Sequence, residues 1–417
     1  MLKFSTPKSF NATKPRKAVT LKASEGSNRL TLKDLEAYKD PLLVRAARGE
    51  EIERVPCWLM RQAGRYQKVY RDLAAKYPSF RQRSETTDLI VEISLQPWKS
   101  FKPDGVIMFS DILTPLPAMG IEFDIDNTKG PIIQKPIRTM EQVDELYDID
   151  LSRLEFVSSA LTHIRAEVGR KSAVLGFIGS PWTLATYIVE GASSQHYRTI
   201  KNLSYSNPDI LEALLRKLTI ALTDYIIFQI DAGAHVVQIF DSWGGHLPPK
   251  DWDRWSKPYL RRIIREVHLA RPHIPLTVFA NGCGGLLERI AATGADIVGV
   301  DWATDLRDAR HRLDVAAGDA DSNTVCLQGN VDPAVLFGPK AAITEAVKDC
   351  LVRGGGRSAA TSLTWDTACS RVPQKTQSPT FSRYRKSLAS RLTYKEGDRG
   401  EKEREVLNYK CQEERDT

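Results

Sequence analysis

Residues 105–111 read GVIMFSD, and this short stretch indicates the fold class. Its apolar run continues without alternation and then ends in Ser110 and Asp111. A continuous apolar run of this length is typical of a strand that is buried on both faces, as in a parallel sheet. Polar residues at its carboxyl end are typical of a sheet that carries its functional groups along that edge.

Further runs of the same kind recur along the chain, at 57–60, 173–178, 235–240, 276–280, 296–300 and 325–328. Segments with helical apolar spacing separate them. One begins at Asp40-Pro41 and stops at Gly49, and another begins at Asn207-Pro208 and stops before Gly233. This alternation predicts a single-domain α/β fold, a (β/α)8 barrel of the TIM type with one strand unaccounted for.

The competing architecture is a doubly wound open sheet. Such a sheet usually has a glycine-rich phosphate loop, G-x-G-x-x-G, after its first strand. Residues 61–65, which follow the first predicted strand, read RQAGR instead. The barrel is therefore favoured, and its chemistry is expected at the carboxyl ends of the strands.

Composition and charge narrow the function classes. The apolar fraction of 42% and charged fraction of 27% are ordinary for a globular protein. No run approaches the ~18 apolar residues that span a bilayer. The net charge of +7 lies at the ends, because residues 1–24 carry +6 and residues 353–417 carry +5, which leaves −4 between them. This distribution argues against nucleic-acid binding. The six cysteines form no C-x-x-C pair, so neither a zinc ribbon nor a redox dithiol is expected.

The two ends differ from the body. Residues 1–24 are basic, rich in Ser and Thr and free of acidic residues, which predicts an organelle transit peptide, with a plain disordered tail as the alternative. Residues 25–353 then form the barrel. In residues 354–417 no apolar period survives, so this tail is predicted to be disordered or poorly packed.

Arg61, Arg65 and Asp111 are the first candidate site residues. Two guanidinium groups at a strand end suit a ligand with carboxylates or phosphates, although two surface salt bridges fit the spacing equally well. A carboxylate directly after an apolar strand is costly unless it is used or paired, and a helix N-cap or a buried ion pair is the alternative for Asp111.

Other polar residues at strand ends are weaker candidates. Tyr187 can hydrogen-bond a ligand, but a core tyrosine is the commoner case. Ser242 has no visible His and Asp partners, so a nucleophilic serine is not expected. Asn281-x-Cys283 stands where a metal site could lie, but Asn is a poor zinc ligand. Asp332 followed by Pro333 predicts the cap of another helix.

Six collinear motifs carry a resemblance to a known family. They are residues 60–66 (MRQAGRY), 109–114 (FSDILT), 182–191, 239–243 (IFDSW), 284–289 (GGLLER) and 327–333 (LQGNVDP). In order and spacing they resemble uroporphyrinogen decarboxylases over about residues 38–353, most of all the plastid branch of plants and algae.

The resemblance implies an activity and a site. The family is a (β/α)8 barrel, usually a homodimer, that uses no metal or organic cofactor. It converts the four acetate side chains of uroporphyrinogen III to methyls in heme and chlorophyll biosynthesis. By resemblance, Asp111 and Arg61 are catalytic, and the substrate is bound by Arg61, Gln62, Ala63, Gly64, Arg65, Phe80, Ser110, Asp111, Tyr187 and Ser242. Chloroplast stroma is the implied location, with mitochondrion or cytoplasm as alternatives.

The C-terminal end departs from the family pattern. The family's eighth strand ends in Leu-Gly-His-Gly, and its His lines the pocket, whereas this chain has no His after His311. Plausible codons for the family stretch Asn-Leu-Gly-His-Gly-Val, read one nucleotide later, spell Thr-Leu-Asp-Thr-Ala-Cys, which is close to residues 364–369. We therefore hypothesise a frameshift or a mispredicted splice junction near residues 354–357, which replaced the eighth βα unit with an aberrant tail.

Two rival functions follow. One is a catalytically impaired relative, because of the changed C-terminus. The other is a zinc- and corrinoid-dependent methyltransferase of the same superfamily, which would need a His-x-Cys pair where this chain has Asn281-x-Cys283.

Overall fold

The computed structural model describes residues 40–126, 130–192, 194, 196–318, 325–355 and 361–365. The predicted transit segment 1–24 and most of the predicted tail lie outside these residues. The described part belongs to one compact unit that begins at Asp40. Within it, no helix has the length and apolar character needed to cross a bilayer.

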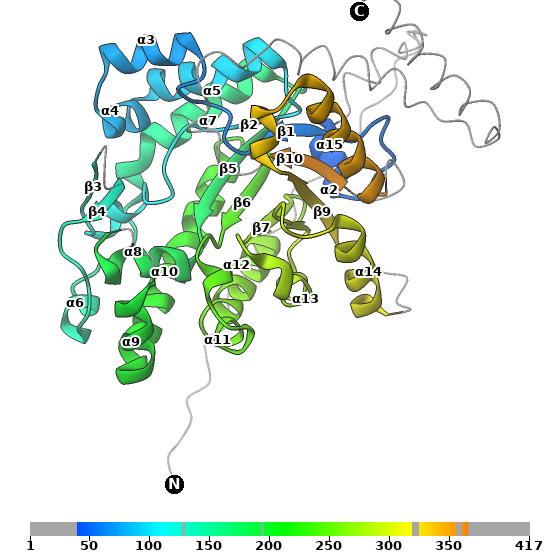
Figure 1. Cartoon of the computed structure of the whole chain (residues 1–417). Coiled ribbons are helices and arrows are strands. Elements are labelled where there is room, and N and C mark those ends of the chain that lie inside the picture. Colours follow the sequence, from blue (N-terminus) through cyan, green and yellow to red (C-terminus); the bar gives the residue numbers. More distant parts are fainter. Residues whose placement is uncertain are drawn as a thin grey trace, which may run out of the picture. The chain divides into compact units, whose positions relative to one another are not determined.

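Eight parallel strands form the central sheet, in the order β1-β10-β9-β8-β7-β6-β5-β2 (Figure 1). The strands are β1 (Cys57–Leu59), β2 (Gly105–Ile107), β5 (Ala173–Gly179), β6 (Val236–Phe240), β7 (Leu276–Phe279), β8 (Ile297–Gly299), β9 (Cys326–Val331) and β10 (Thr361–Trp365). Each of the seven predicted runs coincides with one of the first seven. An antiparallel hairpin of β3 (Phe123–Asp126) and β4 (Gly130–Ile133) was not predicted. The (β/α)8 class is confirmed.

The eighth strand corrects one part of the prediction. We expected residues 354–417 to contribute no strand, but β10 lies within them and pairs with β9 on one side and β1 on the other. Its sequence TSLTW is rich in β-branched and aromatic residues, which favour strands. The segment contains too few apolar residues to predict a strand from sequence alone. Its pairing with the edges of the two neighbouring strands defines it as a strand.

The seam between β1 and β2 is joined by Asp104. Its backbone N–H donates to the carbonyl of Cys57 at 2.8 Å, and its carboxylate accepts the N–H of Cys57 at 2.8 Å. Arg54 donates to both carboxylate oxygens, at 2.5 and 2.6 Å. This partly buried, bidentate pair connects the two ends of the sheet at the start of the strands.

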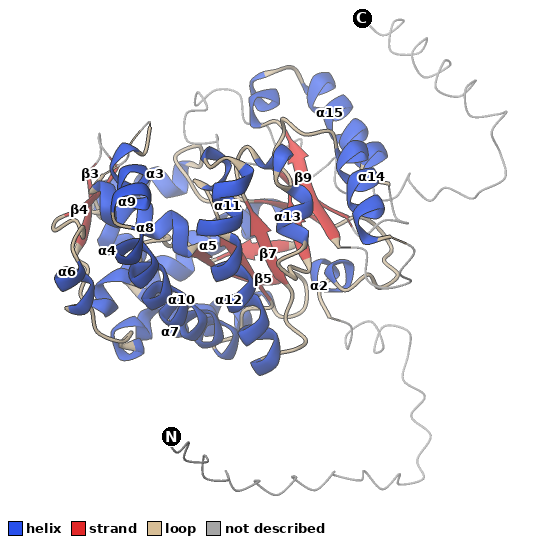
Figure 2. Ribbon diagram, turned by 90° about the horizontal axis from the view of Figure 1, so that it is seen from below, coloured by secondary structure: helices blue, strands red, loops and turns tan. Residues whose placement is uncertain are grey.

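Helices surround the strands (Figure 2). They are α2 (Leu42–Ala47), α3 (Lys68–Lys76), α4 (Phe80–Glu85), α5 (Thr87–Phe101), α6 (Met140–Asp144), α7 (Glu155–Val168), α8 (Pro181–Glu190), α9 (Arg198–Ser206), α10 (Pro208–Asp231), α11 (Pro249–Trp255), α12 (Lys257–Ala270), α13 (Leu287–Ala291), α14 (Leu306–Ala317) and α15 (Lys340–Arg353), with short 3-10 turns η1 (Leu116–Met119), η2 (Leu151–Leu154), η3 (Gly244–His246), η4 (Cys283–Gly285) and η5 (Pro333–Phe337).

Local sequence signals account for several helix ends. Pro208 occupies the first turn of α10, and Gly233, with φ of 115°, lies just past its end, as predicted. Asp332 caps η5 through the N–H of Ala334. For α2 the N-cap is Pro41 rather than Asp40, because the carboxylate of Asp40 instead accepts a hydrogen bond from Arg48.

The first helix of the described chain, α2, closes one end of the barrel. Its Leu43 and Val44 are buried and pack in one apolar cluster with Trp58, Leu175 and Phe279 of the strands. Burial of such side chains stabilises the fold by about 1.5–3 kcal/mol each. The end where the strands begin is thus filled by apolar side chains, and the polar residues that follow the strands lie at the opposite end.

Candidate active site

The loop that presents Arg61 and Arg65 follows β1 and leads into α3. Gln62 is buried and donates from Nε2 to the carbonyl of Gly105 at 2.5 Å, which ties the loop to β2. Arg71 donates to the carbonyl of Arg65 at 2.8 Å and so fixes the far end of the loop. Arg61 and Arg65 themselves are exposed. Their guanidinium groups project from an anchored backbone, as ligand-binding arginines require.

The middle of the loop is anchored as well. Ala63 packs against Tyr70 and Leu73 at the edge of a small apolar cluster. The carbonyl of Gly64 accepts the N–H of Gln67 at 3.1 Å, which closes a turn ahead of α3. Both residues therefore act through the path of the backbone.

Asp111 lies in a tight turn after β2. Its Oδ1 accepts the N–H of Leu113 at 2.9 Å, and its backbone carbonyl accepts the N–H of Thr114 at 3.2 Å. Ser110 and Thr114 share a hydroxyl–hydroxyl hydrogen bond of 2.8 Å in the same turn. The surrounding protein desolvates the carboxylate and raises the pKa of Asp111, while the Leu113 N–H and the positive charge of Arg61 oppose that rise.

Phe80 approaches this turn from α4. Its ring centroid lies 5.4 Å from that of Phe109, two residues before Asp111, at an angle of 51°. The side chain of Ser79 caps the helix by accepting the N–H of Gln82 at 3.2 Å. A partly buried aromatic ring is thus held beside the carboxylate turn.

Tyr187 comes from α8 and joins the group from another side. Burial raises the pKa of its hydroxyl, the negative charge of Asp111 raises it further, and Arg61 partly offsets the effect. These interactions place Arg61, Asp111 and Tyr187 within electrostatic reach of one another. The ring of Tyr187 packs 5.7 Å from that of Trp243.

Ser242 follows β6, between Asp241 and Trp243, and is partly exposed. It joins the group through its neighbour Trp243, which contacts Tyr187 and also Tyr197, at 5.2 Å between centroids. Sequence reasoning did not single out Trp243 as a site residue. The position of Trp243 next to the polar end of a predicted strand could have indicated it as a site residue.

Asp241 is the second residue that the sequence analysis left unassigned. It is fully buried, and its carboxylate accepts hydrogen bonds from the side chains of Ser180, Thr183, Trp252 and Ser256. Burial raises its pKa, and these donors oppose the rise. The network holds the β6 loop, with Ser242 and Trp243, against the start of α8, which carries Tyr187.

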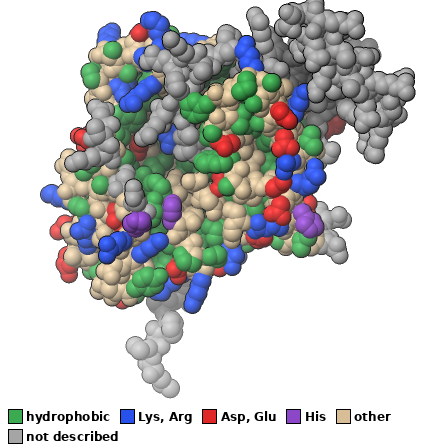
Figure 3. Space-filling model, in the orientation of Figure 1, with side chains coloured by type: hydrophobic (Ala, Val, Ile, Leu, Met, Phe, Trp, Pro, Cys, Tyr) green, Lys and Arg blue, Asp and Glu red, His purple; other side chains and the backbone are tan. Residues whose placement is uncertain are grey.

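The surface charge has no single sign on the face seen in Figure 3, where Lys and Arg side chains are intermixed with Asp and Glu. Among the described residues, no group of three or more His, Cys, Asp and Glu side chains is arranged to hold a metal ion. Cys283 is buried and directs its Sγ toward the carbonyl of Gly299 at 3.7 Å, whereas Asn281 is exposed.

A parallel α/β barrel that gathers two arginines, a desolvated carboxylate and a tyrosine at the carboxyl ends of its strands defines an enzyme class suited to polycarboxylate substrates. Sequence comparison narrows this class. The uroporphyrinogen decarboxylase (URO-D) family model matches residues 38–373, and the chain belongs to that family.

Individual relatives support the same family assignment. The chain is 51% identical over 318 residues to uroporphyrinogen decarboxylase 1, chloroplastic, of Oryza sativa, which covers 76% of this chain and 77% of the rice protein. It is 52% identical to uroporphyrinogen decarboxylase of Picosynechococcus, over 77% of this chain and 89% of that protein. A solved methyltransferase from Methanosarcina mazei has a TM-score of 0.65 at 18% identity, covering 85% of this chain and 100% of its own, and so shares the fold.

Proposed function

We propose that this chain decarboxylates the four acetate side chains of uroporphyrinogen III to give coproporphyrinogen III, with Asp111 as the central catalytic group. Family membership and about half-identity to named decarboxylases support the activity. The observation that carries the residue assignment is the desolvated Asp111 carboxylate, which lies within electrostatic reach of Arg61 and Tyr187.

The chemistry needs a stabilised cation. Loss of CO₂ from a pyrrole acetate requires protonation of the pyrrole ring, so the ring system becomes positively charged. The C–C bond then breaks toward the ring, and the released methylene carbon takes up a proton while the ring loses one, so that one proton replaces each CO₂. A fixed carboxylate that accepts the pyrrole N–H hydrogen bonds stabilises the cation. Asp111 supplies this carboxylate in the proposal.

The remaining residues bind the substrate. Uroporphyrinogen carries eight carboxylates, which suit the exposed guanidinium groups of Arg61 and Arg65, and Arg61 also helps to deliver protons. Tyr187 and Ser242 contact propionate or acetate groups. Phe80 lies against the macrocycle, because its ring already packs beside the Asp111 turn. Gln62, Ala63, Gly64 and Ser110 shape the two loops.

An anaerobic assay with uroporphyrinogen III tests this proposal. The stepwise loss of carboxyl groups is followed by chromatography of the oxidised porphyrins. Coproporphyrin is expected from the full chain and from an Asp209→Asn variant, whose carboxylate is exposed on α10. Transcript sequencing should first confirm the C-terminus of the chain. If the protein with that C-terminus folds but yields no product, the proposal is contradicted and a catalytically impaired relative is favoured.

Two further assignments accompany the activity. We place the enzyme in the plastid stroma, because the rice relative is chloroplastic and residues 1–24 have a transit-like composition. We also propose a homodimer, to be tested by light scattering of the purified chain. A monomeric mass at micromolar concentration would contradict it.

The geometry of the site does not support the methyltransferase alternative. Its fold relative is only 18% identical, and the residue in the position of the required His is the exposed Asn281. The neighbouring Cys283 lies in the apolar core. Methyl transfer is therefore not proposed for this chain.

A further inference from the structure

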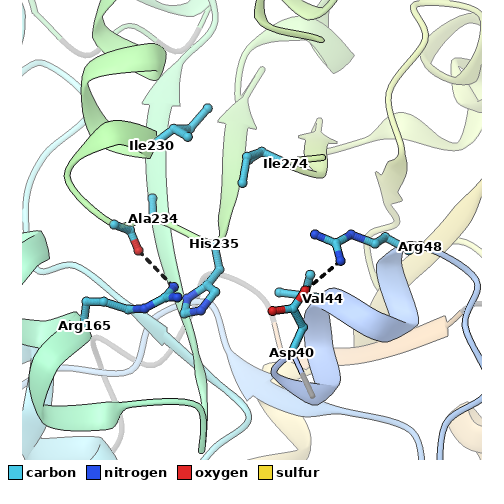
Figure 4. Close-up of a pocket in the computed structure, with 9 residues that line it drawn as sticks. Asp40, Val44, Arg48, Arg165, Ile230, Ala234, His235 and Ile274 are labelled. Atoms are coloured by element: carbon cyan, nitrogen blue, oxygen red, sulfur yellow. Dashed lines mark hydrogen bonds and ion pairs between the residues drawn. The ribbon is translucent and has the colours of Figure 1, made fainter. Parts of the chain in front are cut away.

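A cavity lies at the end of the barrel where the strands begin, opposite the proposed active site. Its volume is about 340 Å³, within the range of small-ligand sites. It is lined by Asp40, Val44, Arg48, Arg165, Ile230, Gly233, Ala234, His235 and Ile274. Figure 4 shows Arg165 and His235 together on one side and the Asp40–Arg48 pair on the other. None of these residues belongs to the proposed active site.

His235 lines this cavity and carries a buried ring nitrogen. Its Nδ1 accepts the backbone N–H of Val174 at 2.9 Å, so the neutral ring must carry its proton on Nε2. Nε2 is buried and has no hydrogen-bond partner among the described residues, and the side chain as a whole is 6% exposed. Burial and the charge of Arg165 lower the pKa of His235 to about 3, so the ring is neutral at physiological pH.

Arg165 lies beside this ring and offers further donors. Its Nη1 makes one long hydrogen bond, 3.4 Å, to the carbonyl of Gly233. Burial lowers the pKa of Arg165, which shows that the guanidinium is partly stripped of water. A desolvated guanidinium next to an unsatisfied N–H donor favours a ligand that accepts hydrogen bonds and carries negative charge.

The wall of the cavity opposite Arg165 does not remove this preference for an anionic ligand. Arg48 donates to Asp40 at 2.7 Å and to the carbonyl of His273 at 2.8 Å, so the Asp40 carboxylate is already paired. The charged lining thus consists of two guanidinium groups and one carboxylate, with Val44, Ile230 and Ile274 as apolar walls. The positive excess and the donors both lie on the side of Arg165.

We propose that this cavity is a binding site for a small oxyanion of phosphate or carboxylate type, held by the Arg165 guanidinium and the Nε2–H of His235. The site is independent of decarboxylation, because it lies at the opposite end of the barrel from Asp111. It would stabilise the start of β6, where His235 already bonds to β5.

Binding of inorganic phosphate to the full chain tests the proposal. Because Arg61 and Arg65 can also bind anions, equilibrium dialysis is performed with the Arg61→Gln/Arg65→Gln variant. One saturable phosphate per chain is expected. Adding Arg165→Gln should weaken that binding about tenfold, since a charge-assisted contact is lost. Arg262→Gln, whose exposed guanidinium pairs with Glu266 on α12, is the matched control and should leave the affinity unchanged.

Nuclear magnetic resonance of the histidine ring nitrogens provides a readout at the site itself. Phosphate should shift the Nε2 resonance of His235 and leave that of the exposed His311 on α14 unchanged. Competition by acetate distinguishes a carboxylate ligand from a phosphate ligand. If Arg165→Gln fails to fold, Arg165→Lys replaces it. No saturable binding, or binding with an unshifted His235 signal, would show that the cavity holds only water and would overturn the proposal.

Discussion

Two carboxylates at the same end of the barrel have opposite surroundings. Asp111 follows β2, and Asp241 follows β6. Asp241 is fully buried and accepts four side-chain hydrogen bonds, from the residue before α8, from α8, from α11 and from the residue after α11. Asp111 is partly exposed, and its Oδ1 accepts the N–H of Leu113. A carboxylate has about four acceptor positions, and the protein uses those of Asp241, whereas among the described residues the Asp111 carboxylate accepts the Leu113 N–H alone.

Burial raises the pKa of both carboxyls, but the compensation differs. At Asp241 it comes from the hydroxyl and indole donors of the network. At Asp111 it comes from one backbone N–H and the charge of Arg61. A perturbed pKa alone therefore does not identify a catalytic carboxylate, and the role that we propose for Asp111 rests on its unused acceptor positions as well.

The largest expected effect is the loss of activity in Asp111→Asn. The amide keeps the size of the side chain but loses the charge that stabilises the cationic ring, so kcat should fall by about 10²–10³-fold. Steady-state assays with uroporphyrinogen III measure it, and circular dichroism should show an unchanged fold. A variant that keeps at least half of the wild-type kcat would remove Asp111 from the mechanism.

The second prediction concerns stability. In Asp241→Asn, the amide nitrogen faces hydroxyl and indole donors, so at least one buried donor loses its acceptor and the buried network is broken. The free energy of unfolding should fall by about 3 kcal/mol. Chemical denaturation measures it. Unchanged stability, with activity lost as in Asp111→Asn, would mean that the two carboxylates do not divide their roles as described.

A third, smaller effect separates the two arginines. Arg65→Gln should raise the KM for uroporphyrinogen about tenfold with little change in kcat, because it removes a contact made equally in ground and transition states. Arg61→Gln should lower kcat as well, since Arg61 lies within electrostatic reach of Asp111. Arg262→Gln serves as the control. Equal effects on KM alone would assign both arginines to binding.

Sequence patterns predicted the barrel because its strands are continuous apolar runs that end in polar residues. They also made Asp111 a candidate site residue, since it lies just after such a run. They did not predict β10, because Thr361–Trp365 contains only two apolar residues, too few to signal a strand, and pairs with its neighbours β9 and β1 in the fold.

The different surroundings of Asp111 and Asp241 could not be predicted from the sequence either. Each residue follows an apolar strand, and the donors to Asp241 come from residues up to 61 positions away. Only the fold brings Ser180 and Trp252 to the same carboxylate. The cavity beside His235 was missed for the same reason, because Val174, which donates to the His235 ring, and Arg165, which lines the same cavity, are distant from His235 in sequence.

The smallest expected effect is a pH-dependent gain in stability in Asp111→Asn. Because burial raises the pKa of Asp111, the native protein keeps this proton to a higher pH than the unfolded chain does, and the charged carboxylate costs stability at pH values above that pKa. Asp111→Asn should therefore be more stable than wild type at pH 7, and the difference should vanish as pH falls below about 4, where the unfolded aspartate is also protonated. Denaturant unfolding at several pH values measures it.

The Asp241→Asn variant provides the comparison. The pKa of Asp241 is also raised, but this variant should be less stable than wild type at pH 7, because the donors around Asp241 require the carboxylate. If both variants were destabilised alike at pH 7, the acceptor positions of Asp111 would be filled by the protein after all.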